Sequence, residues 1–422
     1  MQQIILPILL LLGLSTGIQP VEDIDQYLDN DMDYLVAFYK ERHMHPEISL
    51  KEEQTAKAMA DELRKVGFTV TENVGGYGIV GILKNGDGPQ ILYRSDMDAL
   101  PMLEKTGLDY QSKDESAMHS CGHDMHMTTL VGTARAMAAM KDKWSGTLMM
   151  VGQPAEEIGA GARAMLKDGL YDRFGVPDYG LGLHCNPTIK AGQIGISEGY
   201  TMANTESIDI KIKGVGAHGA SPHMSVDPVV LASLIVMEIQ TIVSRNIKPI
   251  DDAVITVGSI HGGTKHNIIS DEVKLQLTVR TYKEEVRQMI HQRLKEITKG
   301  IAISAGLGED MYPEIVIPEE FTPSNFNDPG LTANIKKAAG KAIGSDNVIY
   351  AEPQMVGEDF ACYGSTDDKV PTVLYWLGTV TQEKIDRGDL PGLHSPYYHP
   401  TPEETLTAGI KVNTQSMIDL MN

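Results

Sequence analysis

The sequence predicts an α/β protein that carries a smaller α+β unit as an insert. Up to about Ala203, short apolar stretches that predict strands alternate with polar tips and with helical periodicity. From there to about Pro313, apolar and polar residues alternate within the strands, as in half-exposed antiparallel sheets. After Pro313 the first pattern returns, and a chain of 422 residues is long enough for two hydrophobic cores.

The first part opens with two amphipathic helices. Apolar residues recur at helical spacing in both, and Pro46 and Gly67 mark their ends. Glycine-rich turns then separate short apolar strands, and one long apolar helical run begins near residue 130. The expected elements are helices at 23–45, 50–66 and 160–168, and strands at 69–71, 78–83, 90–94, 146–152 and 179–183.

The insert is expected to contain three strands and two helices. Its helix over 227–244 is strongly apolar, and a glycine-rich turn at Gly262-Gly263 separates two of its strands. Closing helices complete the α/β unit. The expected elements of the insert are strands at 207–213, 253–260 and 272–280 and helices at 227–244 and 283–302. After the insert, a strand is expected at 371–378 and helices at 329–342 and 402–420.

Composition excludes several classes of partner. The net charge of −21 argues against nucleic acids and against anionic membrane surfaces. Residues 4–14 are apolar, are too short to span a bilayer, and precede small residues, so we expect a signal peptide over 1–17, with an uncleaved anchor as the alternative. Three cysteines do not make a disulfide scaffold, although a bridge between Cys185 and Cys362 is an open alternative.

Polar residues follow four successive segments of the first part, where open α/β sheets place their sites. These segments are expected to deliver Asp98, the turn with Cys121 and His123, the pair Glu156-Glu157, and His184. Gly122 at the centre of that turn can direct both flanking side chains at one point. The alternative is a solvated, histidine-rich start of a helix.

Together with His394, these residues have the chemistry of a metal site. The candidate ligands are Cys121, His123, Glu157, His184 and His394, enough for two divalent ions. A thiolate among the ligands suits Zn²⁺, Mn²⁺ or Co²⁺ better than Mg²⁺ or Ca²⁺.

Adjacent acids point in different directions, so Glu157 can bind metal while Glu156 accepts a proton from activated water. Asp98 can orient an imidazole ligand. An exposed acidic loop and a turn acid are the simpler interpretations of these residues. In the insert, His218 lies among glycines and Arg280 can bind a carboxylate with two hydrogen bonds. A loop histidine and a strand-edge ion pair are the alternatives.

Six separated motifs between residues 30 and 420 resemble the M20 metallopeptidases, specifically the amidohydrolase branch that includes hippurate hydrolase, N-acyl-amino-acid amidohydrolases and auxin-conjugate hydrolases. The motifs are Ser95–Pro101, His119–His126, Gln153–Glu157, Leu183-His184, Gly357–Phe360 and His394–Pro396. Asp96 stands where the wider family has a ligand histidine, and Cys121 replaces an acidic bridging ligand; both departures are typical of this branch.

The resemblance implies a zinc-exopeptidase-like catalytic domain with a mixed, mainly parallel sheet, over residues 24–202 and 313–422. It also implies an inserted dimerisation domain over 203–312. Glu156 would be the general base, supported by Asp98, and the five candidate ligands would hold two metal ions. His218 would reach the neighbouring subunit's site to stabilise the oxyanion, and Asn267 and Arg280 would bind the substrate carboxylate.

We therefore expect an exported, periplasmic or secreted homodimer with no membrane span in its mature form. It would hydrolyse the amide of N-acyl amino acids with metal-activated water. A dipeptidase or carboxypeptidase-like exopeptidase on the same centre is the first alternative. A catalytically inactive binding protein is the second, and the presence of Glu156 speaks against it.

Overall fold

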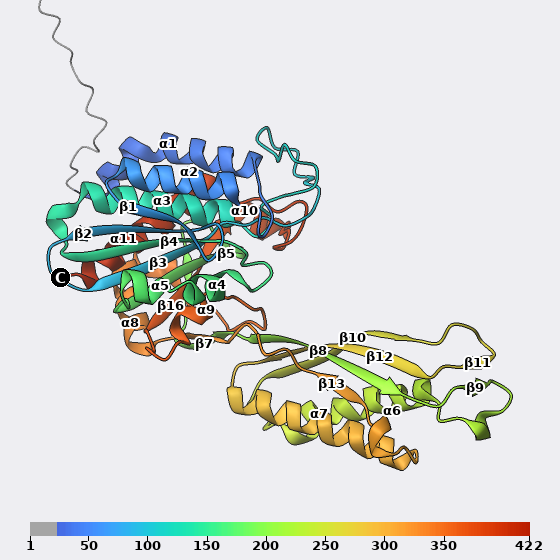
Figure 1. Ribbon diagram of the computed structural model, residues 1–422. Helices are drawn as coiled ribbons and strands as arrows, with labels where there is room; N and C mark the ends of the chain where they lie inside the picture. The colour runs from blue at the N-terminus through green and yellow to red at the C-terminus, as the bar shows by residue number, and fades with distance from the viewer. Residues whose placement is uncertain (1–22) are drawn as a thin grey trace, which may run out of the picture.

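A computed structural model describes residues 23–422, which form a larger and a smaller body (Figure 1). The expected signal peptide at 1–17 lies outside the described residues. The chain passes into the smaller body along β8 (Asn204–Lys213) and returns after β13 (Glu314–Val316). The fold class predicted from the sequence, an α/β body with an α+β insert, is confirmed.

The larger body is built on an eight-stranded sheet in the order β1-β2-β4-β3-β5-β16-β6-β15. Neighbours in its centre, from β4 through β3 and β5 to β16, are parallel, whereas β1, β2 and β4 pair antiparallel. The strands are β1 (Thr69–Val74), β2 (Gly78–Asn85), β3 (Gln90–Asp96), β4 (Gly146–Gln153), β5 (Tyr179–Lys190), β6 (Ile194–Gly195), β15 (Val348–Ile349) and β16 (Thr372–Val380).

Helices cover both faces of this sheet, so its central strands are apolar throughout. One face packs against α1 (Ile24–Met44), α2 (Glu53–Lys65), α3 (His123–Ala139), α8 (Pro329–Ile343) and α11 (Pro402–Leu420). The other face packs against α4 (Gly161–Lys167), α5 (Leu170–Phe174) and α9 (Ala361–Gly364). A short helix, α10 (Gln382–Arg387), and a ribbon of β7 (Gly199–Met202) with β14 (Asn325–Asn327) complete this body.

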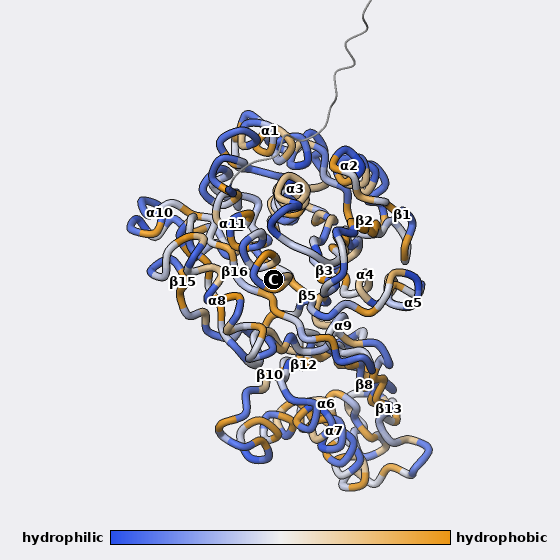
Figure 2. Tube along the Cα trace, turned by 90° about the vertical axis from the view of Figure 1, so that its left-hand side faces the viewer, coloured by the Kyte–Doolittle hydropathy of each residue, from blue (hydrophilic) through white to orange (hydrophobic). Residues whose placement is uncertain are grey.

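The smaller body has its own core and a four-stranded antiparallel sheet in the order β10-β12-β8-β13. Only one face of this sheet is covered, by α6 (Pro228–Thr241) and α7 (Glu284–Ser304), which lie side by side (Figure 2). Its other strands are β10 (Ala253–Gly262) and β12 (Glu272–Thr281). A two-stranded ribbon of β9 (Ala217–His218) and β11 (Ile268–Ile269) forms the distal tip. Single-turn 3₁₀ helices lie at Lys141–Lys143, Pro222–Met224, Glu309–Met311 and Ser345–Asn347.

Two expectations need correction, and one alternative that the sequence left open is decided. Strand β5 continues to Lys190 instead of ending at Leu183, because its pairing with β16 extends past His184. The smaller sheet also extends beyond residue 312, since β13 pairs with β8. Cys185 and Cys362 do not form a bridge, and all three cysteines are buried free thiols.

Candidate metal centre

The turn before α3 brings Cys121 and His123 toward one point. Gly122 has φ +86°, in the left-handed region that only glycine adopts without strain, and it directly precedes the helix. A Cβ at this position would lie 2.9 Å from the Cβ of Cys185, so the turn also has no room for a side chain. The predicted role of Gly122 is therefore confirmed, with His123 as the first residue of the helix.

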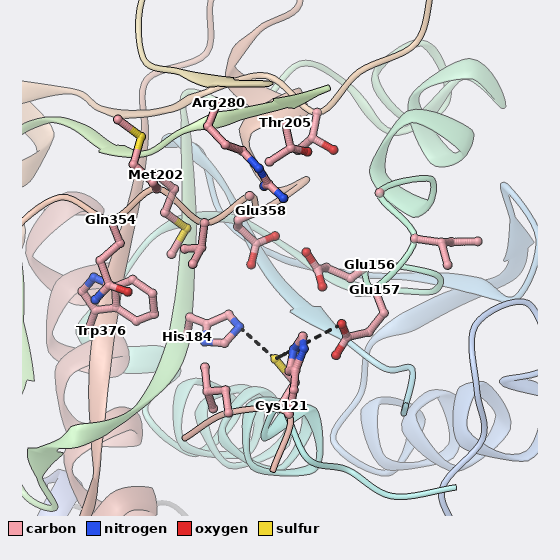
Figure 3. Close-up of a pocket in the computed structure, with 18 residues that line it drawn as sticks. Cys121, Glu156, Glu157, His184, Met202, Thr205, Arg280, Gln354, Glu358 and Trp376 are labelled. Carbon is pink, nitrogen blue, oxygen red and sulfur yellow. Dashed lines mark hydrogen bonds and ion pairs between the residues drawn. The ribbon is translucent and has the colours of Figure 1, made fainter. Parts of the chain in front are cut away.

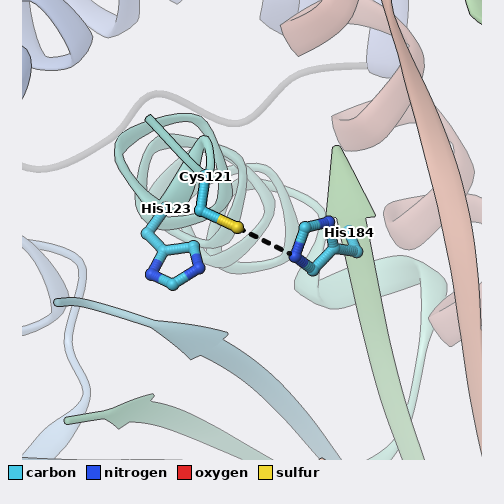
Figure 4. A group of neighbouring side chains, drawn as sticks. All are labelled: Cys121, His123 and His184. Carbon is cyan, nitrogen blue, oxygen red and sulfur yellow. Dashed lines mark hydrogen bonds between the residues drawn. The ribbon is translucent and has the colours of Figure 1, made fainter. Parts of the chain in front are cut away.

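Two of the histidines are anchored by one ring nitrogen and leave the other free. His123 Nδ1 lies 2.7 Å from the carbonyl oxygen of Asp98, and His184 Nδ1 lies 2.9 Å from the carbonyl of Cys185. If each Nδ1 donates to its carbonyl, each Nε2 carries a lone pair toward the site. Figure 4 shows both rings around the Cys121 thiol, on α3 and β5.

The five candidate ligands form two groups that share Cys121. In one group, Cys121 Sγ lies 3.5 Å from His184 Nε2, and His123 completes the set. In the other, His394 Nε2 lies 3.3 Å from Cys121 Sγ and 3.5 Å from Glu157 Oε2. His184 reaches the site from within β5 and not from a strand end. The structure thus brings together all five residues that were predicted from the sequence as candidate ligands.

The loop that carries Glu156 and Glu157 is held by the carboxylate of Asp98. The Asp98 carboxylate accepts hydrogen bonds from the backbone N–H groups of both glutamates, each at 3.1 Å, and from Ser49 Oγ at 2.6 Å. Asp98 Oδ1 also lies 3.4 Å from His123 Nδ1. Asp98 therefore positions a ligand imidazole and the acidic pair at once, which a turn acid would not do.

Two non-glycine residues at the site have left-handed backbones. Ala155, just before Glu156, has φ +53°, and His394 has φ +62°. Such conformations cost on the order of 1–3 kcal/mol and persist only where the surroundings fix them. Here Ala155 N–H donates to Glu52 Oε1 at 2.8 Å, and His394 N–H donates to the carbonyl of Ser120 at 2.9 Å. Both strained residues direct functional side chains into the site.

A buried arginine beneath the site was not anticipated from the sequence. Arg94 is 1% exposed and donates to Asp96 at 2.7 Å, Glu358 at 2.8 Å and Asp359 at 3.0 Å. It joins β3 to a segment 264 residues further along the chain. The motif around Glu358 was recognised in the sequence. The position of Arg94 in an otherwise apolar strand, however, did not indicate which acids it would contact.

Both carboxylate oxygens of Asp96 are engaged, one of them by Arg94. Its second oxygen lies 2.6 Å from His126 Nδ1, and His126 Nε2 accepts from the backbone N–H of Cys185 at 2.8 Å. Because Nε2 accepts, Nδ1 must carry the proton. His126, which we expected to be structural, thus links α3 to β5 beside His184.

Burial governs the protonation of the site. It raises the pKa of Glu157 to about 7, and it raises the pKa of Glu156 well above its usual range, with Glu358 and Asp359 adding to the effect. It lowers the pKa of His184 to about 3. The pKa of His123 is raised despite burial, because the Asp96 carboxylate lies close by. Burial therefore disfavours the ionised form of both glutamates and keeps the His184 imidazole neutral, with a lone pair available for a cation.

The donor set fits divalent cations. His123 Nε2 and Glu157 Oε1 are buried, lie 3.9 Å apart, and have no hydrogen-bond partner among the described residues. Buried polar atoms are almost always satisfied, so two such atoms facing each other indicate a missing ligand. Thiolate, imidazole and carboxylate donors together suit Zn²⁺, Mn²⁺ or Co²⁺.

A pocket of about 590 Å³ opens beside these groups (Figure 3). Arg280 reaches into it from β12, and its one side-chain hydrogen bond among the described residues is to Thr278. No ion pair of Arg280 is found in residues 23–422, so the expected alternative of a strand-edge ion pair is wrong.

The structure does not bring His218 and Asn267 to the pocket of their own chain. Both are exposed at the distal tip of the smaller body, where β9 pairs with β11 and Gly219 N–H donates to the Asn267 carbonyl at 2.9 Å. Figure 1 places this tip at the end of the smaller body that faces away from the larger one.

Comparison with known proteins agrees with this geometry. The family model described as peptidase family M20/M25/M40 matches residues 92–419. N-acetyl-L-cysteine deacetylase of Bacillus subtilis is 38% identical over 78% of this chain and 77% of its own length. Thermostable carboxypeptidase 1 of Saccharolobus solfataricus is 34% identical over 86% of this chain and 91% of its own.

Among solved structures, a dinuclear metal-binding peptidase of family M20 from Bacillus subtilis superposes with a TM-score of 0.77. It is 29% identical to this chain, and the match covers 93% of this chain and 99% of that one.

Proposed function

This chain belongs to the peptidase family M20/M25/M40, and on that premise we propose that it is a metal-dependent amidohydrolase of N-acyl amino acids. The observation that carries the proposal is the pair of ligand groups that share Cys121, with the Glu156 carboxylate beside them. A binding protein would not need a carboxylate base at this position.

We propose that Cys121, His123, His184, Glu157 and His394 hold two divalent cations. Such cations polarise an amide carbonyl and make water more acidic. Zn²⁺, Mn²⁺ and Co²⁺ are the candidates, since the thiolate disfavours harder ions. The unpartnered atoms of His123 and Glu157 support this assignment.

Glu156 acts as the general base. Its Oε2 lies 4.0 Å from His123 Nε2, so the carboxylate faces the space between the ligands and the pocket. It takes the proton of the attacking water and then delivers it to the amide nitrogen, which leaves as an amine. Asp98 holds the backbone of Glu156 and so fixes the direction of the carboxylate.

Arg280 binds the carboxylate of the amino-acid half of the substrate. A guanidinium matches a carboxylate with two parallel hydrogen bonds, and this one is half-buried and lines the pocket with no acidic partner in the described chain. The substrate amide would then lie between Arg280 and the ligand groups.

We propose that His218 and Asn267 act in the site of a second copy of the chain. They are exposed at the distal tip and line no part of their own pocket. A homodimer formed through the smaller body would place the tip of each copy at the other's pocket, where His218 would stabilise the oxyanion and Asn267 the substrate carboxylate.

The apolar surface of α6 supports this dimer. With the π-helical turn that follows it, the helix spans Pro228–Asn246 and has the length and hydropathy of a membrane span, yet a third of it is buried in the smaller body. Its exposed side chains include Leu234 at 50% and Met237 at 72%. A second copy that covered this face would remove the apolar surface from water and would place the tip of each copy near the other's pocket.

One experiment tests the function. Purified protein is given N-acetyl, N-benzoyl and long-chain N-acyl amino acids and free dipeptides, with Mn²⁺, Co²⁺ or Zn²⁺ and with a chelator. We expect chelator-sensitive release of the amino acid from the acylated substrates. No turnover with any metal, in protein that binds the metal, would contradict the proposal.

The second candidate is an exopeptidase on the same centre, which the similarity to a carboxypeptidase favours. The same panel separates the two functions, because cleavage of free dipeptides but not of acylated amino acids would assign the peptidase.

Export of the protein is a separate proposal that depends on residues 1–17 alone. N-terminal sequencing of protein recovered from the periplasm or medium would test it, with a new N-terminus near residue 17 as the expected result.

A further inference from the structure

The pocket beside the metal centre has two chemically different sides. Figure 3 shows Arg280 and Thr205 on one side, and Met202, Gln354 and Trp376 on the side next to His184. Apolar side chains from separate segments line the pocket, and two of them, Ile158 and Val356, remain 57% and 45% exposed. The pocket therefore offers one cationic end and an extended apolar wall.

We propose that Met202, Met355 and Trp376 form a subsite for a bulky apolar acyl group, and that the enzyme prefers medium-chain alkanoyl or aroyl groups to acetyl. This proposal rests on the amidohydrolase function above and names its substrate class. Met202 and Trp376 are buried at 1% and 5% exposure, and Met355 is half-buried.

The subsite is continuous with the metal centre. The Trp376 ring packs edge-on against the ligand His184, with ring centroids 5.4 Å apart at 69°. Trp376 lies in β16, which pairs with β5 at His184, so two adjacent strands fix both rings. An acyl group bonded to a carbonyl at the metal centre would extend directly onto this wall.

The direction of the substrate follows from charge. Arg280 provides the cationic end, whereas a carboxylate placed against Met202 and Trp376 would lose its hydration with only the neutral amide of Gln354 nearby. The amino-acid half therefore faces Arg280 and the acyl half faces the apolar wall.

The size of the pocket favours a large acyl group. A volume of about 590 Å³ is in the range of pockets that enclose whole drug-sized ligands, and the single methyl of an acetyl group would fill only a small part of it. Methionine side chains are flexible and adapt to acyl groups of different shape. Each methylene buried on the wall should raise kcat/KM by up to about fourfold.

The test is a series of glycine conjugates that differ only in the acyl group: acetyl, butanoyl, hexanoyl, octanoyl and benzoyl. We expect kcat/KM to rise with chain length until the subsite is filled, and benzoylglycine to exceed acetylglycine. Equal or falling values from acetyl onward would overturn the subsite while leaving the amidohydrolase in place. Absence of hydrolysis across the series, in protein with bound metal, would instead contradict the proposed function.

Two neighbouring positions then locate the subsite. Met355→Ser should lower the ratio of octanoyl to acetyl kcat/KM several-fold, and Met355→Leu should keep it. Gln354→Leu, which removes an amide from the apolar side, should raise the ratio. Val176→Ser replaces an exposed apolar residue (47%) outside the pocket and serves as the control. An unchanged ratio in both Met355→Ser and Gln354→Leu would place the acyl group elsewhere.

Discussion

The metal centre and the distal tip carry parts of the same proposed chemistry in opposite physical settings. At the centre, His123 and Asp98 are 0% and 1% exposed, and each side chain is held by contacts within one chain. At the tip, His218 and Asn267 are exposed and contact mainly their own loops. Burial therefore completes the first set of residues within a single chain, whereas the second set needs a partner surface.

The two sheets show the same contrast. Helices cover both faces of the larger sheet, but α6 and α7 cover only one face of the smaller sheet. On the uncovered face, surface ion pairs such as Lys274 with Asp209, at 2.6 Å, keep the strands soluble. Such exposed pairs add little stability, so this sheet depends on its helix-covered side.

The largest effect is expected at the candidate metal centre. Glu156→Gln removes the proton acceptor and retains the shape of the side chain, so kcat should fall by about 10²–10⁴. Turnover by the purified variant, measured on the best N-acyl substrate, checks this. Metal content should stay at the wild-type level, because Glu156 is not one of the five ligands. Near-wild-type turnover with metal bound would remove Glu156 from the mechanism.

The next effect tests whether the tip acts in trans. His218→Ala should lower kcat by about 10²–10³, as expected for the loss of one oxyanion donor. When the His218→Ala and Glu156→Gln chains are mixed and allowed to exchange subunits, each mixed dimer regains one site with both groups intact. About a quarter of wild-type activity should return at random assortment.

Failure of the mixture to recover activity, with subunit exchange shown by native mass spectrometry, would contradict the trans arrangement. It would then place the function of His218 within its own chain.

The third prediction concerns the proposed dimer, which substitutions on α6 should disrupt. The double variant Leu234→Glu, Met237→Glu puts two charges on the exposed apolar face of α6, so the protein should become monomeric. It should also lose activity, because His218 of a second copy no longer reaches the site. Analytical ultracentrifugation measures the oligomer. Leu103→Glu, at a residue 51% exposed in the larger body, is the matched control and should remain dimeric. A double variant that stays dimeric would show that another surface forms the interface.

The smallest effect concerns stability within the larger body. His43 is buried between Asp124, at 2.6 Å, and Glu104, at 3.2 Å. These carboxylates outweigh burial and raise the pKa of His43 to about 9, from 6.5. The folded state therefore holds the proton more tightly, and the stabilisation is complete below pH 6.5 and is lost as the pH rises through about 9.

Urea unfolding of the wild type and of His43→Gln should show a difference on the order of 2–3 kcal/mol near pH 6 that shrinks by pH 10. A difference that is independent of pH would mean that His43 is not charged in the folded protein.

Much of the fold could be predicted because periodicity and breakers are local. Helices α1 and α11 begin and end within a residue of their expected bounds, where Pro46 and Pro402 limit them. Strand β5 was cut short because the polar residues after Leu183 look like a loop, whereas their pairing with β16 keeps them in the sheet. Long-range pairing is not visible in local pattern.

The candidate ligands could be named from residue type and spacing, since thiol, imidazole and carboxylate groups concentrated at element ends have few structural roles. Arg94 could not be assigned, because its partners are 264 residues away and its position in a strand resembles a core site. His126 was left out for a similar reason, as its partners Asp96 and Cys185 lie on two different strands.

The sequence by itself determined the alternation of strands and helices, the insert and the set of candidate metal ligands, because each is a property of neighbouring residues. The tertiary structure decided which atoms meet: that Cys121 is common to both candidate ligand groups, that Asp98 holds the backbone of Glu156, and that Arg280 forms no ion pair within residues 23–422. It also decided that His218 lies far from its own pocket. Distances between residues remote in sequence are fixed by packing, and packing depends on the whole chain.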